Sequence, residues 1–348
     1  MFLNTELFGH QRGASNKGYK KIKYGTMVLS TQNLHLGNAN VNQRFEHGMV
    51  SPAYKTYEIT GCSVDLMAQW IKSEAAKRFF YNATTVGASV CRRNVEWDTL
   101  YEQPLYLPSI AEQDKLAKFL TLISDRITKQ QQYVSSLKKY KRGVMQRIFR
   151  QTATQEGEVW TCVRLGDVFK KVSRRNTNGL VKNVITNSAE YGLIPQRNFF
   201  DKDIAVDGNT ANYYIIEKGD FVYNPRKSNT APFGPFNRYT LSERGIISPL
   251  YTCLVLQADI NPSYLAWYFR SDAWHRYIYD NGSQGVRHDR VSMTDDLLMG
   301  IPVMFPDHTT QQIYADMLDK VESRLQAAQK EYELLVKVKG GYVQQLFI

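Results

Sequence analysis

The feature that most constrains this chain is an internal repeat, in which two long segments match at a constant offset of 198 residues. In the first copy, Pro108-Ser-Ile-Ala-Glu-Gln113 leads into a segment that ends Gly143-Val-Met-Gln-Arg-Ile-Phe149. In the second copy, Pro306-Asp-His-Thr-Thr-Gln311 leads into a segment that ends Gly341-Tyr-Val-Gln-Gln-Leu-Phe347. The register holds without a gap, which indicates a duplicated structural unit.

The likeness extends upstream of these segments. Val50-Ser-Pro-Ala-Tyr54 corresponds to Ile247-Ser-Pro-Leu-Tyr251, and Gly25-Thr-Met-Val28 corresponds to Gly219-Asp-Phe-Val222. The second copy is complete from Trp160 onwards, whereas only 24 residues precede Gly25 in the first copy. We therefore expect the first copy to be truncated at its N-terminus, without a counterpart of residues 160–184.

Length and composition agree with two folded units. A single hydrophobic core stops growing at roughly 250–300 residues, and this chain has 348 residues, of which 43% are hydrophobic and 22% charged. The polar stretch between the copies has no apolar periodicity and is the expected linker. We predict an α+β chain with two α/β domains in tandem: residues 1–107 form the first domain, 108–150 a long helix, 151–159 the linker, 160–305 the second domain and 306–348 the second long helix.

Both long segments carry apolar residues at alternating spacings of four and three, which is the heptad pattern of a coiled coil. A helix of about 39 residues would be roughly 58 Å long, and an apolar strip of that length must be covered. The residues expected to pair the helices, or to bind a partner, are Leu116, Leu120, Ile123, Ile127, Val134 and Leu137 in the first segment and Leu318, Val321, Leu325 and Leu335 in the second.

Charge predicts the orientation of this pairing. Residues 138–150 contain six basic residues and no acidic one, whereas the second segment carries Asp316, Asp319 and Glu322 near its start. An antiparallel coiled coil would place these opposite charges side by side, and its length would set the separation of whatever the two domains bind. The alternative is that the segments are core helices of ordinary α/β domains.

The chain carries a formal charge of +11 and has a pI near 9.3, so it should attract a polyanion, either nucleic acid or an anionic membrane. Nucleic acid is favoured because no apolar run approaches the ~20 residues of a membrane span. The N-terminus also lacks a signal-peptide pattern, which predicts a cytoplasmic protein.

No catalytic motif stands out. Ser51-Pro-Ala-Tyr54 and Ser248-Pro-Leu-Tyr251 lack the second proline of an adenine methyltransferase loop, and we interpret both as structural turns. A Walker A loop is absent, the six histidines are dispersed, and the four cysteines form no CxxC pair and are expected to be buried thiols. The sequence therefore predicts no catalytic residue, metal or cofactor in this chain.

Candidate DNA contacts lie on polar loops that offer both phosphate-binding and base-reading side chains. In the second domain, prolines and Gly234 should prevent regular structure and expose the side chains of residues 224–238. Solvated surface loops are the alternative interpretation. The candidates are Arg226, Lys227, Ser228, Asn229, Asn237, Arg238, Gln284, Arg287, His288 and Arg290 in the second domain, and Asn33, His35, Asn38, Arg44, Arg92 and Arg93 in the first.

Taken together, the repeated Pro…Gln and Gly-Val-Met-Gln-type segments, and Val163-Arg-Leu-Gly-Asp-Val168 at the start of the second domain, resemble the specificity subunits of type I restriction-modification systems. The resemblance covers nearly the whole chain. It implies that each domain is a target-recognition domain reading half of a bipartite DNA site, and that the paired helices dock two methyltransferase subunits.

The same resemblance implies restriction subunits in the complex, with S-adenosylmethionine and ATP bound by the partners. This chain departs from the family at the truncated first domain, which puts half-site reading by that domain in question. The competing hypotheses are a stand-alone DNA methyltransferase or nuclease, and an inactive recombination variant.

Overall fold

The computed structural model describes residues 18–89, 92–150, 160–196, 210–284 and 289–347. The chain divides into two compact units, residues 1–135 with 327–348 (unit 1) and residues 136–326 (unit 2). Each unit therefore contains one α/β domain together with parts of two long helices, α4 (Ile110–Arg150) and α9 (His308–Leu346).

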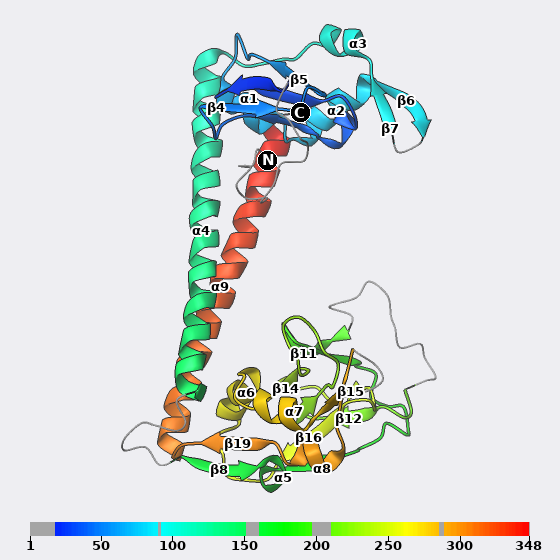
Figure 1. Ribbon diagram of the computed structural model, residues 1–348, viewed down its shortest axis with the longest axis vertical. Coiled ribbons are helices and arrows are strands. Elements are labelled where there is room, and N and C mark those ends of the chain that lie inside the picture. Colours follow the sequence, from blue (N-terminus) through cyan, green and yellow to red (C-terminus); the bar gives the residue numbers. More distant parts are fainter. Residues whose placement is uncertain (1–17, 90–91, 151–159, 197–209, 285–288, 348) are drawn as a thin grey trace. The chain divides into compact units, whose positions relative to one another are not determined.

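The long helices pair in antiparallel fashion within each unit (Figure 1). In unit 1, the ring centroids of Phe119 and Tyr342 lie 5.1 Å apart, and Arg126 Nη2 lies 2.6 Å from Glu331 Oε1. Residues with higher numbers on α4 therefore contact residues with lower numbers on α9. The antiparallel coiled coil predicted from the heptads is confirmed.

Burial follows the predicted seam closely. Alternating steps of four and three residues give ten seam positions on α4, from Leu116 to Ile148, and all ten are buried or half-buried. The same steps on α9, from Tyr314 to Leu346, give positions that are buried or half-buried except at Tyr342. Gln130, a polar residue in the seam, is buried and donates from Nε2 to Ala328 O at 2.9 Å. A buried polar residue at a seam position fixes the register of a coiled coil, because a slipped pairing would leave its amide unsatisfied.

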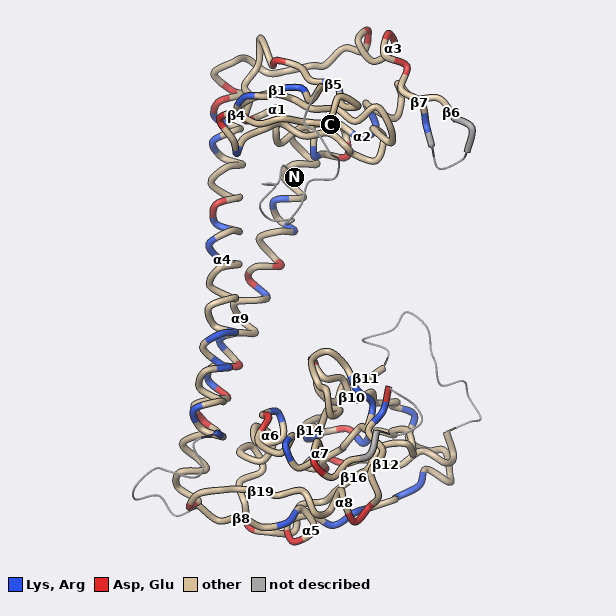
Figure 2. The backbone as a smooth tube through the Cα atoms, viewed as in Figure 1, with Lys and Arg blue, Asp and Glu red and all other residues tan. Residues whose placement is uncertain are grey.

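In unit 2, Lys141 Nζ of α4 lies 2.8 Å from Glu322 Oε2 of α9. This ion pair joins the basic stretch of α4 to the acidic stretch of α9, as the sequence predicted. Lys and Arg follow one another closely along this end of α4 (Figure 2). Such a partly exposed pair contributes only about 0.2–1 kcal/mol, so the charges select the orientation while the apolar seam supplies the stability.

The start of each long helix is fixed to its domain by a buried glutamine. Gln113 accepts from the Ser63 amide at 2.8 Å and donates to Pro108 O at 2.9 Å. Gln311 repeats both contacts, with the Asn261 amide at 2.8 Å and Pro306 O at 2.9 Å. The glutamine of the repeated motif therefore has a structural role in both copies.

The domain of unit 1 has a three-stranded antiparallel sheet of order β3-β2-β5 and two-stranded pairs β1-β4 and β6-β7. Apolar side chains of α1 and α2 pack with Leu29 and Val41 of the sheet to form its core. The elements are β1 (Lys20–Lys23), β2 (Met27–Ser30), the 3-10 helix η2 (Leu34–Leu36), β3 (Ala39–Val41), β4 (His47–Val50), β5 (Tyr54–Tyr57), α1 (Val64–Trp70), α2 (Glu74–Asn82), β6 (Thr84–Ser89), β7 (Arg92–Val95) and α3 (Trp97–Glu102).

The domain of unit 2 has a four-stranded sheet of order β14-β13-β16-β9 and the pairs β12-β15, β10-β11, β17-β18 and β19-β8. Its core is rich in aromatic residues, with Phe236 stacked on Phe269 at 4.0 Å. The elements are β8 (Thr161–Arg164), α5 (Leu165–Val168), β9 (Phe169–Val172), β10 (Ile185–Ser188), β11 (Gly192–Pro195), β12 (Tyr214–Ile216), β13 (Phe221–Tyr223), β14 (Phe236–Arg238), β15 (Gly245–Ile247), β16 (Thr252–Leu256), α6 (Pro262–Arg270), α7 (His275–Asn281), β17 (Ser283–Gln284), β18 (Val291–Ser292), α8 (Asp295–Met299) and β19 (Pro302–Phe305).

The two domains share one plan. The order β3-β2-β5 corresponds to β14-β13-β16, and both Ser-Pro segments form turns in which the fourth residue donates to the first carbonyl, Tyr54 to Ser51 and Tyr251 to Ser248, at 3.1 Å each. The predicted structural turns are thus observed. Within the described part of the first domain, the strand order has no equivalent of β9 beyond β5.

Replacing Gln113 with Ala should destabilise the chain by about 1–3 kcal/mol, because the Ser63 amide and Pro108 carbonyl would lose their shared partner in a buried place. Urea denaturation followed by circular dichroism measures the change. Gln132, an exposed residue of α4, provides the control, since Gln132→Ala should change stability by no more than about 0.5 kcal/mol. Equal effects of the two substitutions would contradict the structural role of Gln113.

Candidate nucleic-acid interface

The structure brings the two predicted DNA-contact segments of the second domain together. Arg226 and Arg290 form an isolated antiparallel bridge, the Lys227 amide donates to Asp289 O at 2.9 Å, and the Val291 amide donates to Pro225 O at 2.9 Å. Segments more than 60 residues apart in the sequence therefore form one surface. The sequence predicts each segment separately and carries no signal for their pairing.

Glycine is required in the loop that follows Arg226. Gly234 has a φ of +85°, and a Cβ at this position would lie 2.0 Å from Asn224 O. Pro232 and Pro235 flank it, and Ser228 exchanges backbone hydrogen bonds with Ala231 at 3.0 and 3.2 Å. This tight turn leaves the side chains of Ser228, Asn229 and Thr230 exposed, as predicted.

The charge of this surface is positive. The side chain of Arg226 is 63% exposed and that of Arg290 is 30% exposed. One carboxylate oxygen of Asp289 lies 3.8 Å from the Nε atoms of both arginines and neutralises them only in part. A polyanion would therefore be attracted to these two guanidinium groups.

Asn237 and Arg238 are not exposed loop residues, which corrects the sequence-based prediction. The loop ends earlier than expected, because β14 starts at Phe236 and Asn237 lies opposite Val222 of β13. Asn237 is 5% exposed and donates from Nδ2 to Asn187 Oδ1 at 2.8 Å and to Ser188 O at 3.1 Å.

Arg238 is half-buried and donates to Ser263 Oγ at 3.3 Å. Burial lowers the pKa of its guanidinium, and the negative charge of Asp319 on α9 opposes that shift. Its side chain therefore connects β14 to α6.

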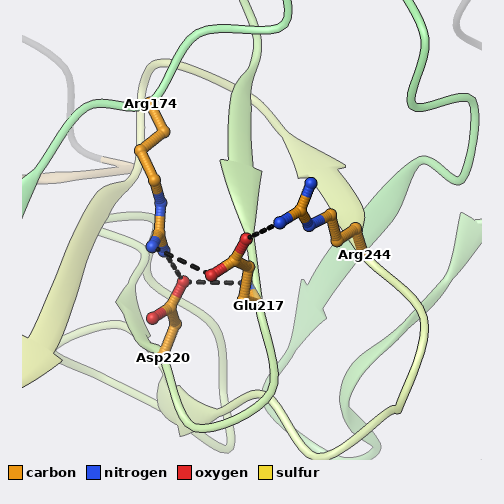
Figure 3. A network of polar contacts seen from close by, with 4 residues as sticks. All are labelled: Arg174, Glu217, Asp220 and Arg244. Atoms are coloured by element: carbon orange, nitrogen blue, oxygen red, sulfur yellow. Dashed lines mark hydrogen bonds and ion pairs between the residues drawn. The ribbon is translucent and has the colours of Figure 1, made fainter.

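An ion network next to this sheet was not anticipated from the sequence (Figure 3). Arg174 pairs with Glu217 at 3.2 Å and also with Asp220, and Arg244 pairs with Glu217 at 2.8 Å. Asp220 Oδ2 accepts from the Glu217 amide at 2.8 Å, and burial raises the pKa of Asp220 despite that bond and Arg174. The network joins the segment after β9 to the turn between β12 and β13.

The first domain offers a similar surface with different side chains. Asn38 and Arg44 are exposed, whereas Asn33 and His35 are half-buried. His35 lies edge-on to the ring of Tyr81, and burial and the charge of Arg93 lower its pKa. Asn33, His35 and Asn38 therefore lie at η2 or within two residues of it.

Arg93 is already held by intramolecular contacts. Its guanidinium lies 4.2 Å from the centroid of the Tyr81 ring and donates to Thr84 Oγ1 at 2.8 Å and Thr84 O at 2.6 Å. The side chains of Arg92 and Gln284, and residues Arg287 and His288, lie outside the described residues.

No metal centre is evident: within the described ranges, His, Cys, Asp and Glu nowhere gather in groups of three that could hold an ion. Cys253 is buried, which raises the pKa of its thiol to about 12, and Cys62 is half-buried. Cys162 is exposed on β8, so the prediction of a buried thiol is wrong there, and Cys91 lies outside the described residues. None of the described helices is long and apolar enough to cross a membrane.

Comparisons with known proteins define the fold. No family model matches the sequence, and no curated protein matches it either. Among solved structures, the chain is similar to the HsdS subunit from Thermoanaerobacter tengcongensis, with 14% identity and a TM-score of 0.51 over 96% of this chain and 83% of that one.

Two further structures agree. The S subunit of a type I restriction-modification system from M. genitalium matches with 13% identity and a TM-score of 0.56, over 97% of this chain and 87% of that one. A structure described as the structural basis of complex assembly and conformational transition of the type I R-M system matches with 14% identity and a TM-score of 0.57. The match covers 96% of this chain and 84% of that one. The resemblance predicted from the sequence is therefore confirmed at the level of the fold.

Asn237→Ala should destabilise unit 2 by about 1–3 kcal/mol, because Asn187 Oδ1 and Ser188 O would lose a donor in a buried place. Asn229→Ala, in the exposed turn before β14, should stay within about 0.5 kcal/mol of the unsubstituted chain. Urea denaturation monitored by tryptophan fluorescence compares the two. If Asn229→Ala were the more damaging change, the assignment of Asn237 to the core would be wrong.

Proposed function

We propose that this chain is a cytoplasmic DNA-specificity subunit of a type I restriction-modification complex, which directs methyltransferase and restriction subunits to a bipartite site. The observation that carries the proposal is the fold similarity, over 96% or more of the chain, to proteins of such systems. The duplicated target-recognition domains give one reader for each half-site, and the net charge of +11 suits a DNA-binding protein.

In this proposal the chain itself has no catalytic role. S-adenosylmethionine and ATP are bound by the methyltransferase and restriction subunits, and the restriction subunits join through the complex. The surface of Arg226, Lys227 and Arg290 contacts DNA in the second domain, and the surface around η2 does so in the first. Phosphate contacts at these surfaces supply affinity, and base contacts supply sequence preference.

The long helices provide the surface for the methyltransferase subunits, of which the proposal includes two. Apolar residues remain exposed on these helices although the seam between them is filled. On α9 of unit 1, Leu334 and Val338 are 60% and 39% exposed and lie one helical turn apart on one face. Exposed apolar groups at this spacing suit a protein partner.

The function is tested by mapping methylated bases in cells with and without this gene by single-molecule sequencing. We expect a split motif that disappears with the gene, and no methyl transfer to DNA by the purified chain alone. Turnover by the isolated chain would establish an enzyme instead. An unchanged methylation map would favour an inactive recombination variant.

DNA affinity should fall steeply with salt, because phosphate contacts release counterions. Lys227→Ala should weaken binding to all sequences alike and reduce the slope of log K against log salt by about 1. Fluorescence anisotropy between about 50 and 200 mM salt measures both quantities. Lys218→Ala, an exposed lysine in the turn before β13, is the control and should leave the slope nearly unchanged. A slope insensitive to Lys227 would remove it from the interface.

The double variant Leu334→Ser and Val338→Ser should lose binding of the methyltransferase subunit while the chain keeps its helical circular-dichroism signal, since both side chains are exposed. Co-purification and isothermal titration with that subunit measure the loss. The matched control replaces the exposed polar residues Lys330 and Lys337 with Ser. Unchanged binding by the apolar variant would show that this face of α9 is not the docking surface.

A further inference from the structure

Each domain has an isolated antiparallel bridge between the segment that follows β2 or β13 and the segment that forms β7 or directly precedes β18. In the first domain Gln32 and Asn94 form an isolated antiparallel bridge, and in the second Arg226 and Arg290 do so. The offset that aligns Gly25 with Gly219 also aligns Gln32 with Arg226, whereas the offset of 198 residues aligns Asn94 with Ser292, two residues after Arg290. We call Gln32–Asn94 and Arg226–Arg290 the bridge pairs. Three of the four side chains are exposed and that of Arg290 is partly exposed.

The turn that carries the first residue of each bridge pair is the same in both domains. Ser30 Oγ accepts from the Gln32 amide at 3.2 Å, and Asn224 Oδ1 accepts from the Arg226 amide at 3.0 Å. Each turn follows directly on the corresponding strand, β2 or β13. The fold therefore fixes where Gln32 and Arg226 are presented, while their chemistry differs between the copies.

The arginine bridge pair is unfavourable as a purely structural feature. Like charges on directly opposite strand residues destabilise a sheet, and the Asp289 carboxylate at 3.8 Å from each Nε compensates only one of the two charges. Both guanidinium groups nevertheless converge on one place with part of their donors exposed. This arrangement suits a ligand that accepts several hydrogen bonds.

We propose that the bridge pairs read bases in the major groove, with Arg226 and Arg290 recognising guanine and Gln32 and Asn94 recognising adenine. The guanidinium fork matches the O6 and N7 acceptors of guanine, whereas a carboxamide matches the donor and acceptor of adenine at N6 and N7. This inference rests on the proposed DNA-specificity function. It predicts that the two half-sites differ in base composition at the positions that the bridge pairs contact.

The test selects binding sites from a random duplex library with the full-length chain assembled with its methyltransferase subunit. The double variant Arg226→Gln and Arg290→Asn should replace guanine with adenine in one half-site and leave the other half-site unchanged. The conservative variant Arg226→Lys and Arg290→Lys should relax the same guanine positions by roughly 5- to 150-fold in relative affinity, because lysine keeps the charge but lacks the fork. Gln32→Ala with Asn94→Ala should relax only the other half-site.

The possible results distinguish a failure of the proposed function from a failure of base reading by the bridge pairs. If the unsubstituted complex selects no motif, the proposed function itself fails. If it selects a motif that the arginine variants weaken equally for all sequences, the pair contacts phosphates and the inference is overturned. A motif unchanged in every variant also overturns it, and the unaffected half-site shows in each experiment that the chain has folded and assembled.

Discussion

The antiparallel pairing of α4 and α9 is the interaction on which the rest of the structure depends. Neither helix could keep its apolar seam exposed to water. The first α/β domain leads into α4, and the second lies between α4 and α9 in the sequence. The seam alone would allow slipped registers. The buried amide of Gln130, bonded to Ala328 O, gives the pairing one register, and Gln113 and Gln311 connect the helix starts to the domains.

Duplication has preserved contacts made through the backbone more strictly than the side chains around them. The glutamine contacts and the Ser-Pro turns recur with nearly the same distances. In the turn before β2 and β13 the contact is kept but the side chain differs. Thr26 Oγ1 accepts from the Lys23 amide at 3.0 Å in the first copy, and Asp220 Oδ2 accepts from the Glu217 amide in the second. The carboxylate also forms an ion pair with Arg174, for which a neutral threonine hydroxyl lacks the charge.

Sequence reasoning reached the fold class, the helix pairing and the seam because these follow from periodicity and from an ungapped repeat. It also identified the exposed turn at residues 228–230. It failed at Asn237 and Arg238, because composition marks where a Pro/Gly-rich loop begins better than where the next strand starts. The Arg226–Arg290 bridge and the Arg174 network join distant segments, and a single sequence carries no signal for such pairings.

The bridge that presents Arg226 and Arg290, and its counterpart at Gln32 and Asn94, depends on main-chain pairing and on the side chains of Asn224 and Ser30. Three of the four presented side chains, those of Gln32, Asn94 and Arg226, are exposed, and substitution of an exposed side chain usually changes stability by no more than about 0.5 kcal/mol. Evolution can therefore exchange them one codon at a time with almost no loss of stability. Under the proposed DNA-reading role, such exchanges would change the recognition sequence while the core and the helices stay constant.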